Sequence, residues 1–484
     1  MLKASAYLLL SLVFSSACGS DRDIFGHSKS ADPALAPADD PDKTTGTSPG
    51  GANVSPGSPM TTKAVLDQAA GDSYLTNVAA LIASVGLGPY HQLGKHGKNI
   101  KVAILDNGFG GLNNSLGKRL PPETELVKSP LDQMENTTHG TKLAEVLYAL
   151  ATGQNKYSEK VDGPKIILMN TNGFTNFKHA VKQVIERKVD IVLYAQVWQY
   201  FGNFDGKGFI NAEVNKATKA GVLWINAAGN MGQSTYNSPV NIGSDGVTVT
   251  LPHEQRFVRF TVPRDQTLVS IALNWNDYKD TTNFATQQDL DLILEDTYQH
   301  QLGTGRLHQT GPNGNKSDSQ YSAYPRETIS TVLNTGTYLL RVEANNRNFT
   351  AASQLRLSID GEGVKMLDQV SDNSVGIPAD NASVLTIGAG DVDYSGKMPA
   401  SGSNKAKSEL QVASSEVRFS DGERHLGTSA ASAIVAAGMA VFQSTYGTFD
   451  RARALGMIGQ GVLATPESRQ APSPTFKLGV PRSR

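Results

Sequence analysis

Five apolar segments alternate with helical patterns along much of this chain, and this alternation limits the fold more than any other feature of the sequence. The segments read IKVAIL, KIILM, DIVLYA, GVLWINAA and, after a long interruption, VLTIGA. Helical patterns begin near His139, Asn176 and Gly208. Apolar strands that are separated by helices are typical of a parallel sheet covered on both faces. We therefore predict an α/β fold with a mostly parallel sheet and helices on both faces.

The interruption, from about residue 241 to residue 365, has a different pattern. Short alternating runs such as RFVRFTV, LVSIALNW, DLDLIL and TYLLRVEA are separated by turn residues, with almost no helical periodicity. Such runs predict antiparallel strands with one buried face. We expect an all-β insertion here, a sandwich or a jelly roll, within the parallel-sheet domain.

The N-terminus has the pattern of an export signal. Lys3 is followed by the apolar run AYLLLSLVF, which is too short to span a membrane as a mature helix, so residues 1–17 are predicted to be a signal peptide. Cys18 is the single cysteine of the chain and follows SSA, a pattern that resembles the lipidation site of bacterial lipoproteins. Ser15 and Ala17 also satisfy the small-residue rule for ordinary signal cleavage, which would give a freely secreted protein.

Composition then divides the rest of the chain. Residues 18–62 are rich in Pro, Gly, Ser and Asp and are predicted to be a disordered tether. Residues 63–240 and 366–484 would form the two parts of the parallel-sheet domain around the insertion at 241–365. With 44 Lys and Arg against 45 Asp and Glu, the net charge is −1, which argues against a nucleic-acid partner. We expect an exported protein that contacts a membrane through a lipidated Cys18.

Four polar residues fall where chemistry is expected in such a sheet. Asp106 and Asn230 follow strand segments, and His139 and Ser429 begin helical patterns. Ligand sites of open α/β sheets lie at the carboxyl ends of the strands. A serine needs an imidazole to take its proton, a carboxylate to orient the imidazole and donors for the developing oxyanion. Ser429 is also compatible with a plain helix N-cap.

The motifs around these residues, LDNGFGG, HGTKLAE, AAGN and GTSAASA, resemble in this order those of the subtilisin-like serine peptidases, the subtilases. The resemblance implies a subtilisin-like fold and a serine endopeptidase that hydrolyses protein or peptide substrates through an acyl-enzyme. It implies that Ser429 is the nucleophile, His139 the general base, Asp106 the residue that orients it, and Asn230 the oxyanion donor.

The sequence departs from the family pattern at several positions. Ala430 and Ala433 replace the usual Met and Pro after the nucleophile, and Glu145 replaces a Gly of the histidine motif. Ala195–Trp198 replaces a Ser-x-Gly stretch that in subtilases pairs with substrate backbone and forms a wall of the specificity pocket. These changes favour, as an alternative, a binding or scaffold protein with weak or no catalysis. An esterase or amidase that uses the same triad is a third hypothesis.

Two further groups of side chains allow more than one interpretation. Trp198, Tyr200 and Phe201 are compatible with an aromatic binding site or with core packing. Three carboxylates of the insertion, Asp277, Asp289 and Asp291, are candidate ligands of a structural Ca²⁺, or else solvent-facing acids. The sequence indicates no other cofactor.

Overall fold

The computed structural model describes residues 61–67, 73–309, 322–369, 374–393, 395–396, 410–465 and 474–481. The predicted signal peptide, Cys18 and the tether up to residue 60 lie outside the described residues. The helices are α1 (Thr62–Leu66), α2 (Val78–Ser84), α3 (Gly88–Gln92), α4 (Leu112–Ser115), α5 (His139–Thr152), α6 (Phe174–Glu186), α7 (Phe209–Lys219), α8 (Thr428–Tyr446) and α9 (Arg451–Gly459), with a short 3-10 helix at Pro252–Glu254. Among these helices none is long and apolar enough to cross a membrane.

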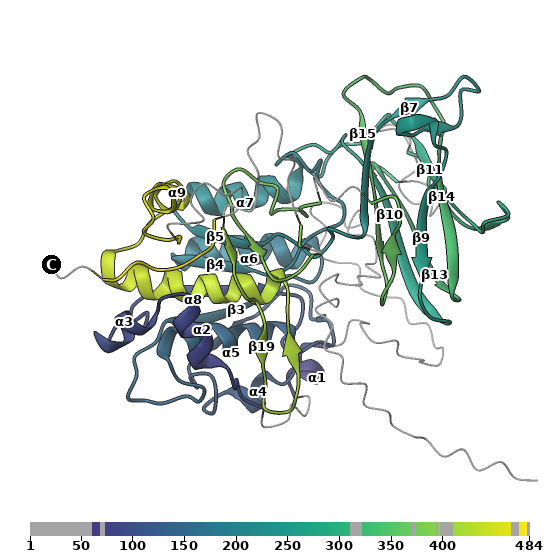
Figure 1. The fold of residues 1–484 in the computed structure, drawn as a ribbon. Helices are drawn as coiled ribbons and strands as arrows, with labels where there is room; N and C mark the ends of the chain where they lie inside the picture. Colours follow the sequence, from purple (N-terminus) through teal and green to yellow (C-terminus); the bar gives the residue numbers. More distant parts are fainter. Residues whose placement is uncertain are drawn as a thin grey trace, which may run out of the picture.

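A parallel sheet forms the centre of the larger part of the molecule (Figure 1). Its strands are β1 (Lys101–Asp106), β2 (Glu125–Val127), β3 (Lys165–Asn170), β4 (Ile191–Tyr194), β5 (Leu223–Ala227), β17 (Leu385–Ala389) and β18 (Leu410–Val412). Their order is β18-β17-β5-β4-β1-β3-β2, and every neighbouring pair is parallel. This arrangement confirms the predicted sheet.

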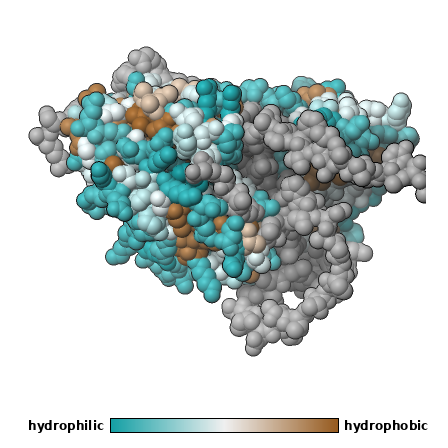
Figure 2. Space-filling view, turned by 90° about the horizontal axis from the view of Figure 1, so that it is seen from below, coloured by the Kyte–Doolittle hydropathy of each residue, from teal (hydrophilic) through white to brown (hydrophobic). Residues whose placement is uncertain are grey.

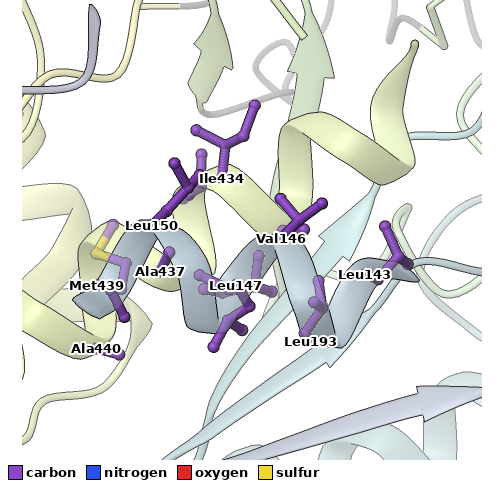
Figure 3. Packing of buried hydrophobic residues seen from close by; sticks show 14 of the residues in the cluster. Leu143, Val146, Leu147, Leu150, Leu193, Ile434, Ala437, Met439 and Ala440 are labelled. Atoms are coloured by element: carbon purple, nitrogen blue, oxygen red, sulfur yellow. The ribbon is translucent and has the colours of Figure 1, made fainter. Parts of the chain in front are cut away.

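Helices cover both faces of this sheet. On one face, α5 and α8 are buried along almost their whole length, and most positions on them are apolar or small. Figure 3 shows Leu147 of α5 near Ala437 of α8, with Leu193 of β4 farther along α5 toward Leu143. The amphipathic helices α6 and α7 cover the other face through a second apolar cluster. Both faces of the sheet are therefore kept from water, as its continuous apolar strands require.

The interruption folds into two antiparallel sheets, which stand to one side of the parallel sheet (Figure 1). One sheet has the order β13-β10-β15-β6, from strands Arg326–Leu333, Thr267–Trp275, Gln354–Asp360 and Thr235–Pro239. The other has the order β12-β11-β14-β9-β16, from Gln301–Gly305, Leu290–Glu295, Gly336–Ala344, Val258–Val262 and Lys365–Met366, and the short strands β7 (Asn241–Ile242) and β8 (Val249–Thr250) pair with each other. Inner-face residues of both sheets share one apolar cluster, so this region is an antiparallel sandwich. β6 precedes residue 241 and nevertheless pairs with β15.

The sandwich shares a core with the parallel-sheet domain. Tyr324 packs on Phe201 and Tyr278 on Phe209, with ring centroids 5.6 and 6.0 Å apart. Asn203 donates a hydrogen bond to the carbonyl of Tyr278 and accepts one from its N–H, at 3.0 and 2.8 Å. Because Phe201 is buried in this cluster, the aromatic run after β4 serves core packing between the two regions.

The surface is predominantly hydrophilic on the face seen in Figure 2, where hydrophobic residues form a few small patches between polar ones. Single exposed apolar side chains of this kind are ordinary on folded proteins. A remaining pair of short strands, β19 (Val417–Arg418) and β20 (Arg424–His425), forms a hairpin just before α8. Glu423, in the turn of this hairpin, and His425, on β20, are hydrogen bonded to each other.

Candidate active site

Asp106 and His139 are in direct contact. Asp106 is the last residue of β1 and is fully buried, and His139 is the first residue of α5. The His139 Nδ1–H donates to Asp106 Oδ2 at 2.7 Å, while the backbone N–H of Gly108 donates to Asp106 Oδ1 at 3.2 Å. A carboxylate can only accept, so this contact fixes the imidazole tautomer with its proton on Nδ1. Nε2 is then the ring nitrogen that can take up a proton.

Ser429 lies in the first turn of α8. The N-cap position of this helix is Gly427, with no side-chain cap, so the N-cap interpretation of Ser429 is wrong. The hydroxyl is almost fully buried and donates to the carbonyl of Ala195, just past the end of β4, at 3.2 Å. The hydrogen bond from Ser429 therefore connects the start of α8 to the carboxyl edge of the sheet.

Asn230 follows β5 and is fastened to the residue before Ser429. Its side-chain oxygen accepts from the N–H of Thr428 at 3.1 Å and from the Thr428 hydroxyl at 3.0 Å. The same hydroxyl accepts from the N–H of Gly229 at 3.2 Å. Because Thr428 donates to Asn230 through its N–H and its hydroxyl, the accepting atom of the Asn230 amide is the oxygen and the other atom is the nitrogen. The amide nitrogen is consequently the side chain's donor toward any other group.

Gln196, just past the end of β4, lies beside the imidazole of His139. Its side-chain nitrogen lies 3.5 Å from His139 Nδ1, and its carbonyl accepts from Asn226 at 3.2 Å. The ends of β1, β4 and β5 and the starts of α5 and α8 therefore come together here, as the parallel sheet predicts. The Gln196 contact was not predicted from the sequence, where Gln196 stood only as a departure from the family pattern.

A second group of ionisable side chains flanks His139. The His425 ring is nearly parallel to the His139 ring, with centroids 6.5 Å apart and an interplanar angle of 12°. His425 Nε2 lies 2.7 Å from Glu423 Oε1, and Lys142 of α5 lies 3.5 Å from the other oxygen of Glu423. The hydrogen bond from His425, helped by the charges of His425 and Lys142, lowers the pKa of Glu423 to about 2. Glu423 is therefore ionised, and its charge is balanced.

Sequence reasoning missed this group because Glu423 lies on a turn and His425 on a two-residue strand. A short hairpin has no periodicity from which a contact with α5 follows. The only available signal is that Glu423 and His425 lie within six residues of Ser429 in the sequence.

Glu145, a departure from the family motif, is explained by its partners. Arg119 Nε lies 2.7 Å from Glu145 Oε1, and both side chains are at least 95% buried. Ser115 donates to the same oxygen at 2.8 Å. A carboxylate inside the protein needs such partners. Glu145 thus holds α5 against the segment that contains Ser115 and Arg119.

The three carboxylates suggested as Ca²⁺ ligands have protein partners. Asp277 pairs with Lys279 at 2.7 Å and accepts from Thr286. Asp289 and Asp291 both accept from the side chain of Asn345, at 3.1 and 2.8 Å. Within the described ranges, no group of three or more His, Cys, Asp or Glu side chains could hold a metal ion. The side chain of Asn345 thus bridges Asp289 and Asp291.

Comparison with known proteins relates part of this chain to subtilisins. It is 26% identical over 151 residues to the thermostable alkaline protease of Halalkalibacterium halodurans, covering 31% of this chain and 40% of that protein. It is 24% identical over 177 residues to subtilisin amylosacchariticus of Bacillus subtilis subsp. amylosacchariticus, covering 34% and 44% of the two chains. The chain thus spans less than half the length of these relatives. It matches no protein-family model.

The fold has a counterpart among solved structures. The CspB protease of Clostridium perfringens superposes with a TM-score of 0.53 at 13% identity, over 83% of this chain and 97% of that one. At this identity the likeness concerns the fold. Together with the parallel sheet and the separate antiparallel sheets, it confirms the predicted subtilisin-like α/β fold. In partial sequence and in fold, the chain is thus similar to subtilisin-like serine proteases.

Proposed function

We propose that this chain is an exported serine endopeptidase with Ser429 as nucleophile, His139 as general base, Asp106 as the residue that orients the base, and Asn230 as oxyanion donor. The observation that carries the proposal is the 2.7 Å contact between Asp106 and His139 at the same sheet edge as the buried Ser429. Similarity to subtilisins over part of the chain supports the reaction class.

Each step of the reaction has a group to perform it. The Ser429 hydroxyl leaves the Ala195 carbonyl, and its proton passes to His139 Nε2 as Oγ bonds to the substrate's carbonyl carbon. Asp106 stabilises the imidazolium, and the amide nitrogen of Asn230 stabilises the oxyanion. The C–N bond then breaks as His139 returns the proton to the leaving amine. Water hydrolyses the acyl-enzyme by the same proton route and restores the Ser429 hydroxyl.

The test is labelling with a fluorophosphonate, which reacts with activated serines. Wild-type protein should be labelled, and Ser429→Ala and His139→Ala should each abolish labelling and peptide cleavage. Ser444→Ala is the matched control, because this serine lies on the same helix and donates within it, to Val441 O at 2.7 Å. Labelling that persists in Ser429→Ala would refute the assignment of the nucleophile.

The rival function, a scaffold without catalysis, is favoured by one observation. The last residue of the stretch Ala195–Trp198 is already paired, since the Trp198 N–H donates to Ile377 O at 2.7 Å. A scaffold would show no Ser429-dependent labelling in a folded protein. An esterase or amidase would be labelled and would hydrolyse small acyl substrates but no peptides.

The proposal includes export and domain organisation. Residues 1–17 would be removed, Cys18 would be lipidated, residues 18–62 would form the tether, and residues 241–365 would be an insertion in a catalytic domain formed by 63–240 and 366–484. Cys18→Ser should then release the protein from the membrane fraction of the producing cell. Wild-type protein that is soluble and begins at an unmodified Cys18 would refute the anchor.

A further inference from the structure

Val197 occupies a space directly beside the proposed reacting groups. It follows Ala195, the acceptor of the Ser429 hydroxyl, by two residues, and its side chain is 7% exposed. It packs against Met231, which is 1% exposed and follows Asn230 directly. The valine side chain therefore lies between the strand that meets the nucleophile and the segment that carries the oxyanion donor.

Two glycines show how tightly this space is filled. A Cβ placed on Gly376 would lie 2.5 Å from Val197 Cβ, a distance that real side chains do not tolerate. A Cβ on Gly229, which has a φ of +91°, would lie 3.2 Å from Val197 Cγ2. The valine thus leaves no room for a side chain at position 376 and little room for one at position 229. The space next to Gly229 and Gly376 is therefore filled by the side chain of Val197.

This packing is held in place by backbone pairing. Trp198 and Ile377 exchange two hydrogen bonds, of 2.7 Å from the Trp198 N–H and 3.4 Å from the Ile377 N–H. Because Ile377 follows Gly376 and Trp198 follows Val197, the pairing fixes the valine over the glycine. The segment therefore cannot yield to a bulky group without losing these bonds.

The reacting geometry leads a substrate side chain toward the same place. The acyl carbon must bond to Ser429 Oγ while its oxygen meets the amide nitrogen of Asn230, so the side chain of the acyl residue begins next to Gly229 and Ala195. On this ground, which rests on the proposed function, we propose that Val197 fills the pocket for the acyl residue. The enzyme would then cleave after glycine or alanine and exclude large side chains.

The test uses two kinds of substrate analogue that differ only at the acyl residue. Peptide p-nitroanilides ending in Gly, Ala, Leu or Phe report kcat/KM, and peptidyl aryl phosphonates ending in Ala or Phe report the rate of covalent labelling. Wild type should favour Ala over Phe by about 100-fold, near the upper range for discrimination by size in an apolar pocket. Val197→Ala and Val197→Gly should raise kcat/KM for Leu and Phe at least tenfold.

Val192→Ala is the matched control, since it removes the same atoms from a buried valine of β4 that belongs to the apolar cluster beneath α6 and α7. It should leave the preference unchanged. A wild type that cleaves after Phe as well as after Ala would overturn the proposal, and so would folded, labelled Val197 variants with an unchanged preference. Absence of Ser429-dependent labelling would instead refute the proposed function. If the variants fail to fold, the wild-type labelling rates decide: faster labelling by the Ala phosphonate than by the Phe phosphonate supports the proposal, and equal rates overturn it.

Discussion

Glu423, beside the candidate active site, is partly buried and Glu327, in the sandwich, is buried, and their surroundings shift their pKa values in opposite directions. Glu423 lies against His425 and Lys142, which lower its pKa to about 2. Glu327 is buried, and this burial raises its pKa to about 8, with Asp291 and Asp289 adding to the rise. Opposite charges surround the first carboxyl, and like charges lie near the second.

The difference indicates how the partners of a carboxyl set the direction in which its pKa moves. In the parallel-sheet domain, Asp106 meets His139 and Glu145 meets Arg119 as well. Each of these buried carboxylates thus has a hydrogen-bond donor or a cation as its partner. The Glu327 carboxyl instead takes up a proton at neutral pH, which costs folding energy and serves no reaction that we infer. Opposite-charge pairing, more than burial, thus distinguishes Glu423 from Glu327.

The largest effect is expected at the first of these pairs. Asp106→Asn should lower turnover by about 10⁴-fold, because an amide permits the wrong tautomer of His139. Steady-state cleavage of a peptide measures the change. Asp190→Asn is the control, since Asp190 accepts from the Lys101 N–H at 2.8 Å at the opposite end of β1. Equal losses in the two variants would show that the Asp106 effect is structural.

The parallel sheet was predictable because its strands are continuous apolar runs with helices between them. Such runs bury both faces of a sheet, so the topology leaves few alternatives. The strand ends then predicted the meeting of Asp106 with His139, since carboxyl ends of parallel strands share one edge. The sequence did not predict that β6, before residue 241, pairs with β15, because a short polar strand has no buried pattern to mark it.

The contacts around the site were less predictable than its principal residues. Gln196, His425 and Val197 are placed by turns and by pairing between residues far apart in the sequence, such as Trp198 with Ile377. No local periodicity encodes such contacts. The role of Glu145 depends likewise on Arg119, 26 positions earlier.

A second prediction concerns the pair beneath α5. Arg119→Leu should destabilise the protein by about 3–5 kcal/mol, because it leaves the Glu145 carboxylate buried without its cation. Chemical denaturation measures the loss. The double variant Arg119→Leu with Glu145→Leu should recover most of it, since both charges are then gone. A double variant as unstable as the single one would show that packing, and not charge, is responsible.

Glu327→Gln should have the opposite effect. A carboxyl whose pKa is raised on folding stabilises the fold least at high pH, and stability falls as pH rises from 4.5 toward 8. At pH 7 the protonation of Glu327 costs about 3 kcal/mol at most, from 2.5 pKa units at 1.36 kcal/mol each. Glu327 accepts from the side chain of Gln309 at 2.6 Å and from the Leu307 N–H at 3.0 Å, and a glutamine oxygen can accept both of these bonds. The variant should therefore be more stable at pH 7.

Denaturation at pH 5 and pH 8 checks this prediction, because the gain should be larger at pH 8. Glu362→Gln is the control on the same sandwich, since this carboxylate is 61% exposed in its pair with Arg264. Exposed pairs contribute about 0–1 kcal/mol. A gain in Glu327→Gln that does not depend on pH would contradict the linkage to a proton.

Glu423→Gln should show the smallest effect and the reverse pH dependence. A carboxyl whose pKa is lowered on folding stabilises the fold above its unfolded pKa of 4.5, and that contribution is lost as pH falls toward 2. Because the side chain is 33% exposed, solvent screening reduces the effect to about 1–2 kcal/mol at pH 7. Denaturation at pH 7 and at pH 3 should show that the variant's loss of stability is smaller at pH 3. The comparison requires a variant that is still folded at pH 3. A loss of the same size at both values would mean that Glu423 acts through the shape of the hairpin, and the contrast with Glu327 would then concern packing instead of charge.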